Sequence, residues 1–231
     1  MKYKRVLLKL SGEALKNNKD AIIDFDYVKE VCSKISKSYN EGYQFGIVIG
    51  GGNIWRGRNN ACIDIDSSDK IGILGTTINA IAVNSVLNNI GTNSNLVNAF
   101  NIENILANQS NYNIESLLNC GIVVFGGGTG FGGCSTDTAA AKRAVEMKAD
   151  AIVKITNVDG VYDKDPNKYD DTIMYDKVSF DEAIKKELKV LDMAAMKICQ
   201  SSNIPIIVIN INKLDMLSCV LNGDDTGTII Y

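Results

Sequence analysis

The chain has 231 residues, a net charge of −3, 45% hydrophobic residues and 22% charged residues, an ordinary composition for one α/β domain with a sizeable core. The charged residues form no basic cluster, so we expect no nucleic-acid partner. The first residues lack a signal-peptide pattern and no run of about 18 apolar residues occurs, which favours a cytoplasmic protein without a membrane partner.

Histidine is absent from the sequence, and the six cysteines are dispersed without CxxC spacing. The first absence excludes Ser-His-Asp and Cys-His catalysis and disfavours a zinc site. We interpret the cysteines as free thiols in a reducing compartment. An enzyme built from this chain must therefore use lysine, carboxylates, backbone dipoles or a metal held by oxygen.

Hydrophobic periodicity and turn residues divide the chain into alternating strands and helices. This alternation predicts an α/β three-layer sandwich, with a mostly parallel central sheet and helices on both faces. No repeat, linker or low-complexity tract interrupts it, so we expect a single domain over 1–231. In chain order, the expected elements are a strand over 4–10, a helix over 26–39, a strand over 45–49, a helix from 67 or 68 to 89, a strand around 96–97, a helix over 114–119, a strand over 122–125, a helix over 137–148, a strand over 151–155, helices over 179–188 and 191–201, and strands over 206–209 and 228–230.

Several of these strands end in residues that suit anion binding. Lys9 stands near the end of the first strand, beside Ser11 and Gly12, where it could reach a phosphate; a solvated charge at a strand end is the alternative. The strand over 45–49 runs into three glycines, 50–52, and Arg56 follows them. Because the carboxyl ends of parallel strands share one edge of a sheet, we expect these residues to converge.

A second glycine loop, with six glycines in the eight residues 126–133, follows the strand over 122–125. Backbone N–H groups of such a loop, together with the positive end of the next helix, form an anion site; a flexible surface loop is the alternative. The stretch 128–133 also matches the dinucleotide fingerprint GxGxxG. The capping residues lie beyond its third glycine and the nearest acids precede the next strand, which disfavours NAD. The P-loop pattern is absent as well.

Three other side chains are compatible with a nucleotide ligand. In the turn-rich loop over 156–166, Tyr162 could stack on a base and Asp165 could accept hydrogen bonds from ribose or adenine. Asp69 is expected in the first turn of its helix, where the helix dipole by itself favours an acid.

Four segments in order along nearly the whole chain resemble the amino-acid kinase superfamily and, within it, the bacterial UMP (uridylate) kinases: 3–15, 47–57, 126–140 and 154–166. The segments 187–195 and 227–230 fit the same family. The resemblance implies the amino-acid kinase (carbamate kinase-like) fold. It also implies transfer of the γ-phosphoryl group of ATP to UMP with Mg²⁺, giving UDP and ADP in pyrimidine nucleotide biosynthesis.

The resemblance further implies a role for each matching residue. Lys9 and Asp137 are expected to be catalytic, with Asp137 orienting the phosphate-binding lysine. The expected ATP contacts are Lys9, Leu10, Ser11, Gly12, Gly52, Arg56, Thr156, Tyr162 and Asp165. The expected UMP contacts are Gly51, Asp69, Thr129, Gly130, Phe131, Gly132, Gly133, Cys134, Ser135 and Thr136. Residues 1–150 are thus expected to bind UMP and residues 151–231 to bind ATP, with Mg²⁺ held mainly by the ATP phosphates and no protein metal site.

Simple chemistry agrees with this expectation. A nucleoside monophosphate already carries ionised oxygens, so its phosphorylation needs no general base and tolerates the absence of histidine. Catalysis then reduces to aligning two anions and neutralising the charge between them with lysine, backbone N–H groups and metal.

The acceptor loop departs from the family pattern. Where the family usually carries Asn-Pro-Phe-Phe, this chain has Phe131-Gly132-Gly133-Cys134. We therefore expect a more flexible loop, an altered UMP affinity and a looser subunit contact. No motif assigns a second catalytic lysine; Lys154 and Lys189 are candidates, with a structural role as the alternative for each.

Other functions remain open at this point. Acetylglutamate, carbamate, aspartate and isopentenyl phosphate kinases share the fold, and a catalytically silent nucleotide-binding protein could use it too. Asp69, Thr129 and Thr136 favour a nucleotide acceptor. The resemblance also implies a homohexamer and possible effectors, GTP as activator and UTP as inhibitor.

Overall fold

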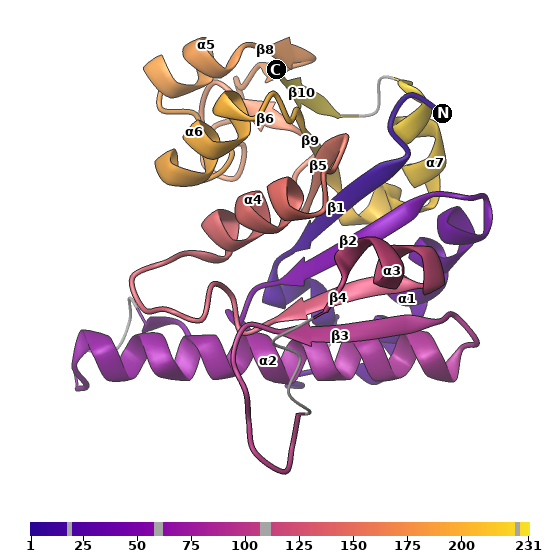
Figure 1. Cartoon of the computed structure of the whole chain (residues 1–231). Coiled ribbons are helices and arrows are strands. Elements are labelled where there is room, and N and C mark those ends of the chain that lie inside the picture. The colour runs from indigo at the N-terminus through magenta and orange to yellow at the C-terminus, as the bar shows by residue number, and fades with distance from the viewer. Residues whose placement is uncertain (18–19, 58–61, 107–111, 225–226) are drawn as a thin grey trace.

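The computed structural model describes residues 1–17, 20–57, 62–106, 112–224 and 227–231. Its centre is an eight-stranded sheet in the order β3-β4-β2-β1-β5-β9-β10-β8, with every pairing parallel except β9 with β10 (Figure 1). The strands are β1 (Arg5–Leu10), β2 (Gln44–Ile49), β3 (Ser94–Asn98), β4 (Ile122–Gly126), β5 (Ala151–Thr156), β8 (Lys177–Val178), β9 (Ile206–Asn210) and β10 (Thr228–Ile230).

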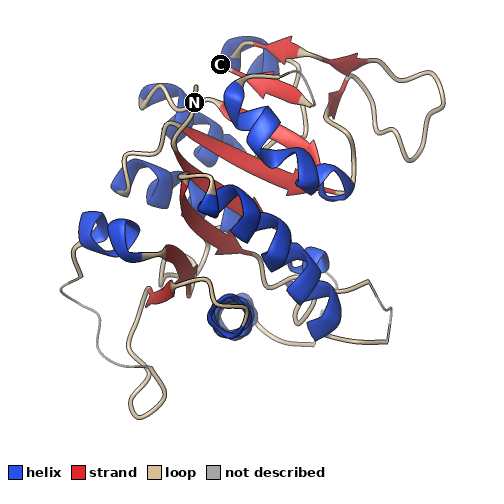
Figure 2. Cartoon of the chain, turned by 90° about the vertical axis from the view of Figure 1, so that its right-hand side faces the viewer, coloured by secondary structure: helices blue, strands red, loops and turns tan. Residues whose placement is uncertain are grey.

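Helices cover both faces of this sheet, so the predicted α/β sandwich is confirmed (Figure 2). A short hairpin, β6 (Val161–Tyr162) with β7 (Met174–Tyr175), stands beside it. The helices are α1 (Phe25–Asn40), α2 (Ile65–Asn89), α3 (Ile114–Cys120), α4 (Thr136–Glu146), α5 (Phe180–Lys185), α6 (Met193–Ser201) and α7 (Leu217–Asn222), with 3₁₀ helices η1 (Gly12–Leu15) and η3 (Ile211–Met216).

The alternation of side chains along β1 divides the core into two parts. Val6, Leu8 and Leu10 are buried among residues of α1, α2, η3 and α7. Leu7 faces the other way, into the cluster that contains residues of α4, α5 and α6. Because successive residues of a strand point to opposite faces, Lys9 lies on the same face as Leu7, beneath α4.

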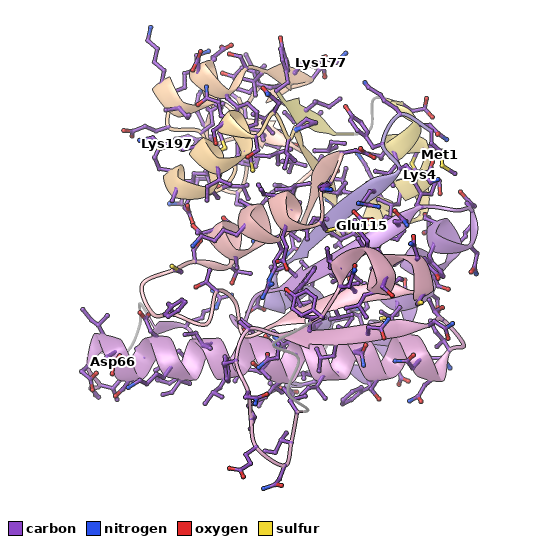
Figure 3. All side chains as sticks on the ribbon, in the orientation of Figure 1. Met1, Lys4, Asp66, Glu115, Lys177 and Lys197 are labelled. Carbon is purple, nitrogen blue, oxygen red and sulfur yellow. The ribbon has the colours of Figure 1, made fainter. Side chains whose placement is uncertain are left out.

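Helix α2 is longer than predicted. It begins at Ile65, after Asp64, whose carboxylate accepts a hydrogen bond from the Ser67 N–H at 2.8 Å. The prediction of a start at Ser67 or Ser68 was therefore wrong, and so was the placing of Asp69 in the first turn. Several residues here can cap a helix, and the local pattern favoured one too late in the chain. Asp66, labelled in Figure 3, is the acid of the first turn.

By length and composition, α2 is the one helix in the described part of the chain that could cross a membrane, with a mean hydropathy of 1.3 over 18 residues. Half of that window is buried within the molecule. It packs against β2, β3 and β4, which is the position of a core helix.

The other predicted helices and strands are confirmed to within a few residues. The sequence missed η1, the β6–β7 hairpin, β8, η3 and α7. The strands β6, β7 and β8 have two residues each, too few for an alternating pattern to appear.

Candidate active site

The first two loops at the carboxyl edge of the sheet touch each other. The Gly50 N–H donates to the Leu10 carbonyl at 3.0 Å, which joins the ends of β2 and β1. A Cβ on Gly12 would lie 2.7 Å from the Gly50 oxygen and 2.8 Å from the Gly52 nitrogen. Since real Cβ atoms do not come so close to backbone, glycine is required at position 12.

These loops present backbone donors. Within the described residues, the N–H groups of Gly12, Gly51 and Gly52 donate to no other group of the protein. Backbone N–H groups that converge at the end of a strand are typical of phosphate binding. The expected convergence of the first strand end and the first glycine loop is therefore present.

Lys9 pairs with Asp137 across the gap between β1 and α4. Its Nζ lies 2.6 Å from Asp137 Oδ1, and both side chains are largely buried. The contact lacks the alignment of a hydrogen bond, so Asp137 Oδ1 is satisfied by charge alone. Ser135 caps α4 by accepting from the Thr138 N–H, which puts Asp137 in the first turn of that helix, as predicted.

Lys154 occupies the position in β5 directly beside Lys9 in β1. It lies on the same face of the sheet, and its Nζ donates to the Val190 carbonyl. Burial lowers the pKa of Lys154, and the nearby Asp137 carboxylate opposes that effect. The structure thus ties this lysine to the segment before α6.

Asp192 is a site residue that the sequence interpretation missed. It caps α6 by accepting from the Ala195 N–H at 2.9 Å, and it also accepts from the hydroxyls of Ser135 and Thr138. Burial raises its pKa, but these hydrogen bonds outweigh burial and leave the pKa below its ordinary value. The signal available was an aspartate near the start of a helix, a typical N-cap, but the predicted helix began at residue 191 and so placed Asp192 inside it instead of at its cap.

Glu13 was also missed. Arg56 Nη2 lies 2.6 Å from Glu13 Oε1, and Arg56 Nε donates to the Gly52 carbonyl at 3.2 Å. Burial raises the pKa of Glu13, while the hydrogen bonds from Arg56 and Lys16 lower it, and the net shift is downward. The ion pair with Glu13 holds Arg56 beside the loop after β1 and the loop after β2.

The glycines of the second glycine loop allow backbone conformations that other residues rarely adopt. Gly127, Gly128, Gly130 and Gly133 have φ values of +75°, +57°, +81° and +73°, a region that favours glycine. The loop bends back onto α2, where the Gly133 N–H donates to Asp69 Oδ2 at 2.5 Å. Phe131 is 75% exposed at its outer side.

A cavity of about 510 Å³ lies between the two glycine loops and α2. Trp55 and Ser68 also line it and were not predicted; the Trp55 Nε1–H donates to Ser68 Oγ at 2.9 Å. The predicted ligand contacts along its wall are Gly51, Gly52, Arg56, Asp69, Thr129, Phe131, Gly132, Cys134, Ser135 and Thr136.

A second cavity, of about 240 Å³, lies beside the β6–β7 hairpin. Tyr162, Asp165 and Lys189 line it. The backbone hydrogen bond from Asn167 lowers the pKa of Asp165. The remaining predicted residues line neither cavity: Lys9, Leu10, Ser11, Gly12, Gly130, Gly133, Asp137 and Thr156.

Strand order explains how these parts are arranged. The loops after β2 and β4 border the larger cavity, and the smaller cavity is lined by the segment that follows β5. Strand β1 lies between β2 and β5, so Lys9 stands at the junction of the two sides. The fold thus places two cavities and a set of backbone N–H donors along one edge of a parallel sheet, an arrangement typical of α/β proteins that bind phosphate-containing ligands.

Comparison with known proteins identifies the family. The model of the amino acid kinase family matches residues 4–210, so the chain belongs to that family. It is 38% identical to a uridylate kinase of Bacteroides thetaiotaomicron, over 100% of this chain and 99% of the other. The crystal structure of a UMP kinase from Ureaplasma parvum has a TM-score of 0.91 at 35% identity, covering 100% and 99% of the two chains. A UMP kinase structure from Bacillus anthracis has a TM-score of 0.91 at 32% identity, covering 99% and 96%.

Proposed function

We propose that this protein is a UMP kinase that transfers the γ-phosphoryl group of ATP to UMP, giving UDP and ADP. The observation that carries the proposal is the Lys9–Asp137 pair at the end of β1, on the strand between the two cavity-bearing sides of the sheet. An amine at that point can bridge two phosphates that approach from opposite sides. The relatives named above support UMP as the acceptor.

The catalytic step requires that the two substrates are aligned and that the negative charge between their phosphates is neutralised. Lys9 Nζ faces the negative charge that moves from donor to acceptor, and the N–H groups of Gly12, Gly51 and Gly52, which donate to no other group among the described residues, supply fixed donors. Asp137 pairs with the lysine and directs it toward the junction. It takes no proton, because the acceptor phosphate is already ionised.

The larger cavity is the proposed UMP site. Its size suits a small ligand, and Asp69, Thr129 and Thr136 supply polar groups along its wall. Gly130 and Gly133 belong to the same loop and shape it. We assign the 1–150 part of the chain to the acceptor on this basis.

The smaller cavity is the proposed adenosine site, in the 151–231 part. Tyr162 offers an aromatic face and Asp165 a carboxylate. Thr156 stands at the end of β5, at the entrance to this segment. Leu10, Ser11, Gly12, Gly52 and Arg56 would meet the phosphates of ATP.

We propose that Mg²⁺ arrives with ATP as part of the substrate. The described residues contain no group of three His, Cys, Asp or Glu side chains that could hold a metal ion. An ion bound to the phosphates would add positive charge where the phosphoryl group moves.

Self-association, as a hexamer, belongs to the same proposal. Helix α2 exposes Ile71, Leu74, Ile78 and Ile81, each at least 36% exposed and spaced to lie on one face. An apolar face of this kind on a helix is suited to a second copy of the chain. A cytoplasmic location, GTP activation and UTP inhibition are proposed from the family resemblance.

A coupled assay of ADP release tests the function. We expect steady release with ATP, Mg²⁺ and UMP, weaker release with CMP, and none above background with acetylglutamate or carbamate. ADP release with acetylglutamate or carbamate as the acceptor would assign the protein to another kinase of the same family. Binding of both nucleotides without release would make it a silent nucleotide-binding protein.

A further inference from the structure

Asn79 of α2 is a fully buried polar residue directly beneath the first glycine loop. Its side chain is 0% exposed, and its neighbours on the core face of the helix, Ala80 and Val83, are apolar. A buried amide costs free energy unless its hydrogen bonds are made. Its polar contacts therefore indicate what the residue is for.

The amide of Asn79 forms a reciprocal pair with Asn53. Asn79 Nδ2 donates to Asn53 Oδ1 at 2.7 Å, and Asn53 Nδ2 donates to Asn79 Oδ1 at 3.1 Å. Asn79 Nδ2 donates also to the Gly50 carbonyl at 2.8 Å, and Asn53 Nδ2 to the Ile22 carbonyl at 2.9 Å. Each Nδ2 thus uses both of its N–H donors and each Oδ1 accepts a hydrogen bond, and every contact fixes the loop or the segment beside it.

The bond to Gly50 has a directional consequence. The Gly50 carbonyl and the Gly51 N–H belong to one planar trans peptide unit and point in opposite directions. Since a carbonyl oxygen can only accept, the donor side of Asn79 must face it. Holding the Gly50 oxygen against α2 therefore turns the Gly51 N–H away from α2. Gly51 lines the larger cavity, and its N–H donates to no other group among the described residues.

The same pair reaches the loop after β1. A Cβ on Gly12 would lie 2.3 Å from Asn53 Oδ1 and 2.7 Å from the Gly50 oxygen. Both oxygens that Asn79 bonds thus pack against Gly12, so the amide pair sets the spacing between the two loops that present the N–H groups of Gly12 and Gly51.

We propose that Asn79 and Asn53 are positioning residues for phosphoryl transfer, which aim the N–H groups of Gly51 and Gly12 at the reacting phosphates. This inference rests on the proposed kinase activity. It assigns the pair no contact with substrate: the amides act through the loops.

The test compares Asn79→Leu, Asn79→Asp, Asn53→Ala and the double variant Asn53→Ala/Asn79→Leu in steady-state assays. We expect each single change to lower kcat at least tenfold, because the N–H groups of Gly51 and Gly12 would no longer point at the phosphoryl group as it is transferred. The KM for UMP should rise less than threefold, because the rest of the larger cavity is unchanged. A displacement of about 1 Å can cost about 100-fold in rate. The double variant should be no more than about threefold slower than the worse single variant, since both residues act through one pair.

Asn84→Ala is the matched control. Asn84 is another asparagine of α2, bonded to Ser94 far from the glycine loops, so its loss should lower the melting temperature while kcat stays within twofold. Asn79→Asp keeps the acceptor for Asn53 but loses the donor to Gly50, and it should be as slow as Asn79→Leu. If an Asn79 variant does not fold, the half-buried Asn53→Ala decides the question by itself.

Unchanged kcat in Asn53→Ala and in the folded Asn79 variants would overturn the proposal. A loss of kcat in Asn84→Ala equal to that in the Asn53 and Asn79 variants would also overturn the proposal, because the fall in kcat would then follow from the loss of stability alone. An inactive wild-type protein would instead overturn the proposed kinase function.

Discussion

Asp69 accepts a hydrogen bond from the Gly133 N–H at 2.5 Å, and this contact closes the second glycine loop onto α2. A Cβ on Gly132 would lie 3.0 Å from the same carboxylate, and Gly133 has a φ of +73°. The two glycines that replace the family's proline and aromatic residue are thus the residues that let the backbone reach Asp69.

We expect Asp69→Ala to act on the acceptor alone. The change removes a polar wall group of the larger cavity and releases its loop, so the KM for UMP should rise at least tenfold. The KM for ATP should stay within about twofold. Initial-rate measurements with each substrate varied in turn provide the check, and an equal rise in both constants would contradict the assignment of this cavity to UMP.

Lys9→Ala should leave UMP binding largely intact and lower turnover by two or more orders of magnitude, because the bridging charge is lost. It should also destabilise the fold, since Asp137 is left as a largely buried carboxylate that has lost its ion-pair partner. Titration calorimetry with UMP and single-turnover rates measure the two effects. A turnover close to that of the wild type would remove Lys9 from the mechanism.

The double variant Lys9→Ala/Asp137→Ala separates these effects. It should regain part of the stability that Lys9→Ala loses and none of the activity. Lys70→Ala is a suitable control, because its ion pair with Asp66 is exposed on the surface. It should change neither stability nor rate appreciably.

Gly51→Ala should destabilise the protein by about 2 kcal/mol, as overpacking commonly does. The new Cβ would lie 2.8 Å from the Gly72 carbonyl oxygen and 3.1 Å from the Thr76 nitrogen, both in the backbone of α2. Gly52→Ala is the matched control, because no atom of a described residue lies within 4 Å of the new Cβ. Urea unfolding of the two variants should differ clearly, and equal midpoints would mean that the loop does not pack on α2 in this way.

Asp192 should make stability depend on pH in the acid range. Its pKa in the folded protein lies below the ordinary value of 3.8, because hydrogen bonds from Ser135, Ala195 and Thr138 outweigh the opposing effect of burial. Its stabilising contribution is therefore present above the unfolded pKa and is lost as the pH falls through the folded pKa. Asp192→Asn should cost about 1 kcal/mol at pH 7, and the gap to the wild type should shrink below about pH 4. Urea midpoints across this range, with Asp66→Asn as a surface control, test it; a gap that does not vary with pH would exclude the carboxylate as its source.

The sequence by itself determined the succession of most strands and helices along the chain, the presence of capping residues after the second glycine loop, and the two glycine loops. These features depend on side-chain periodicity and backbone freedom, which act between residues close in the chain. The same local reasoning failed at the start of α2, where Asp64, Asp66, Ser67, Ser68 and Asp69 all have the chemistry of a helix N-terminus and only packing selects among them.

Which distant groups meet depends on the tertiary structure; for Lys9 and Asp137 the family resemblance had implied the pairing, and the structure supplies its physical reason. Lys9 pairs with Asp137 because β1 is central in the sheet and α4 covers the face to which Lys9 points. Asn79 and Asp192, unremarkable in the sequence, became site residues because one helix passes under the first glycine loop and another begins beside Ser135. Such contacts depend on the order of strands in the sheet and on helix packing. Both are stabilised by burial across the whole core, so residues that are close in the sequence show no pattern from which these contacts could be predicted.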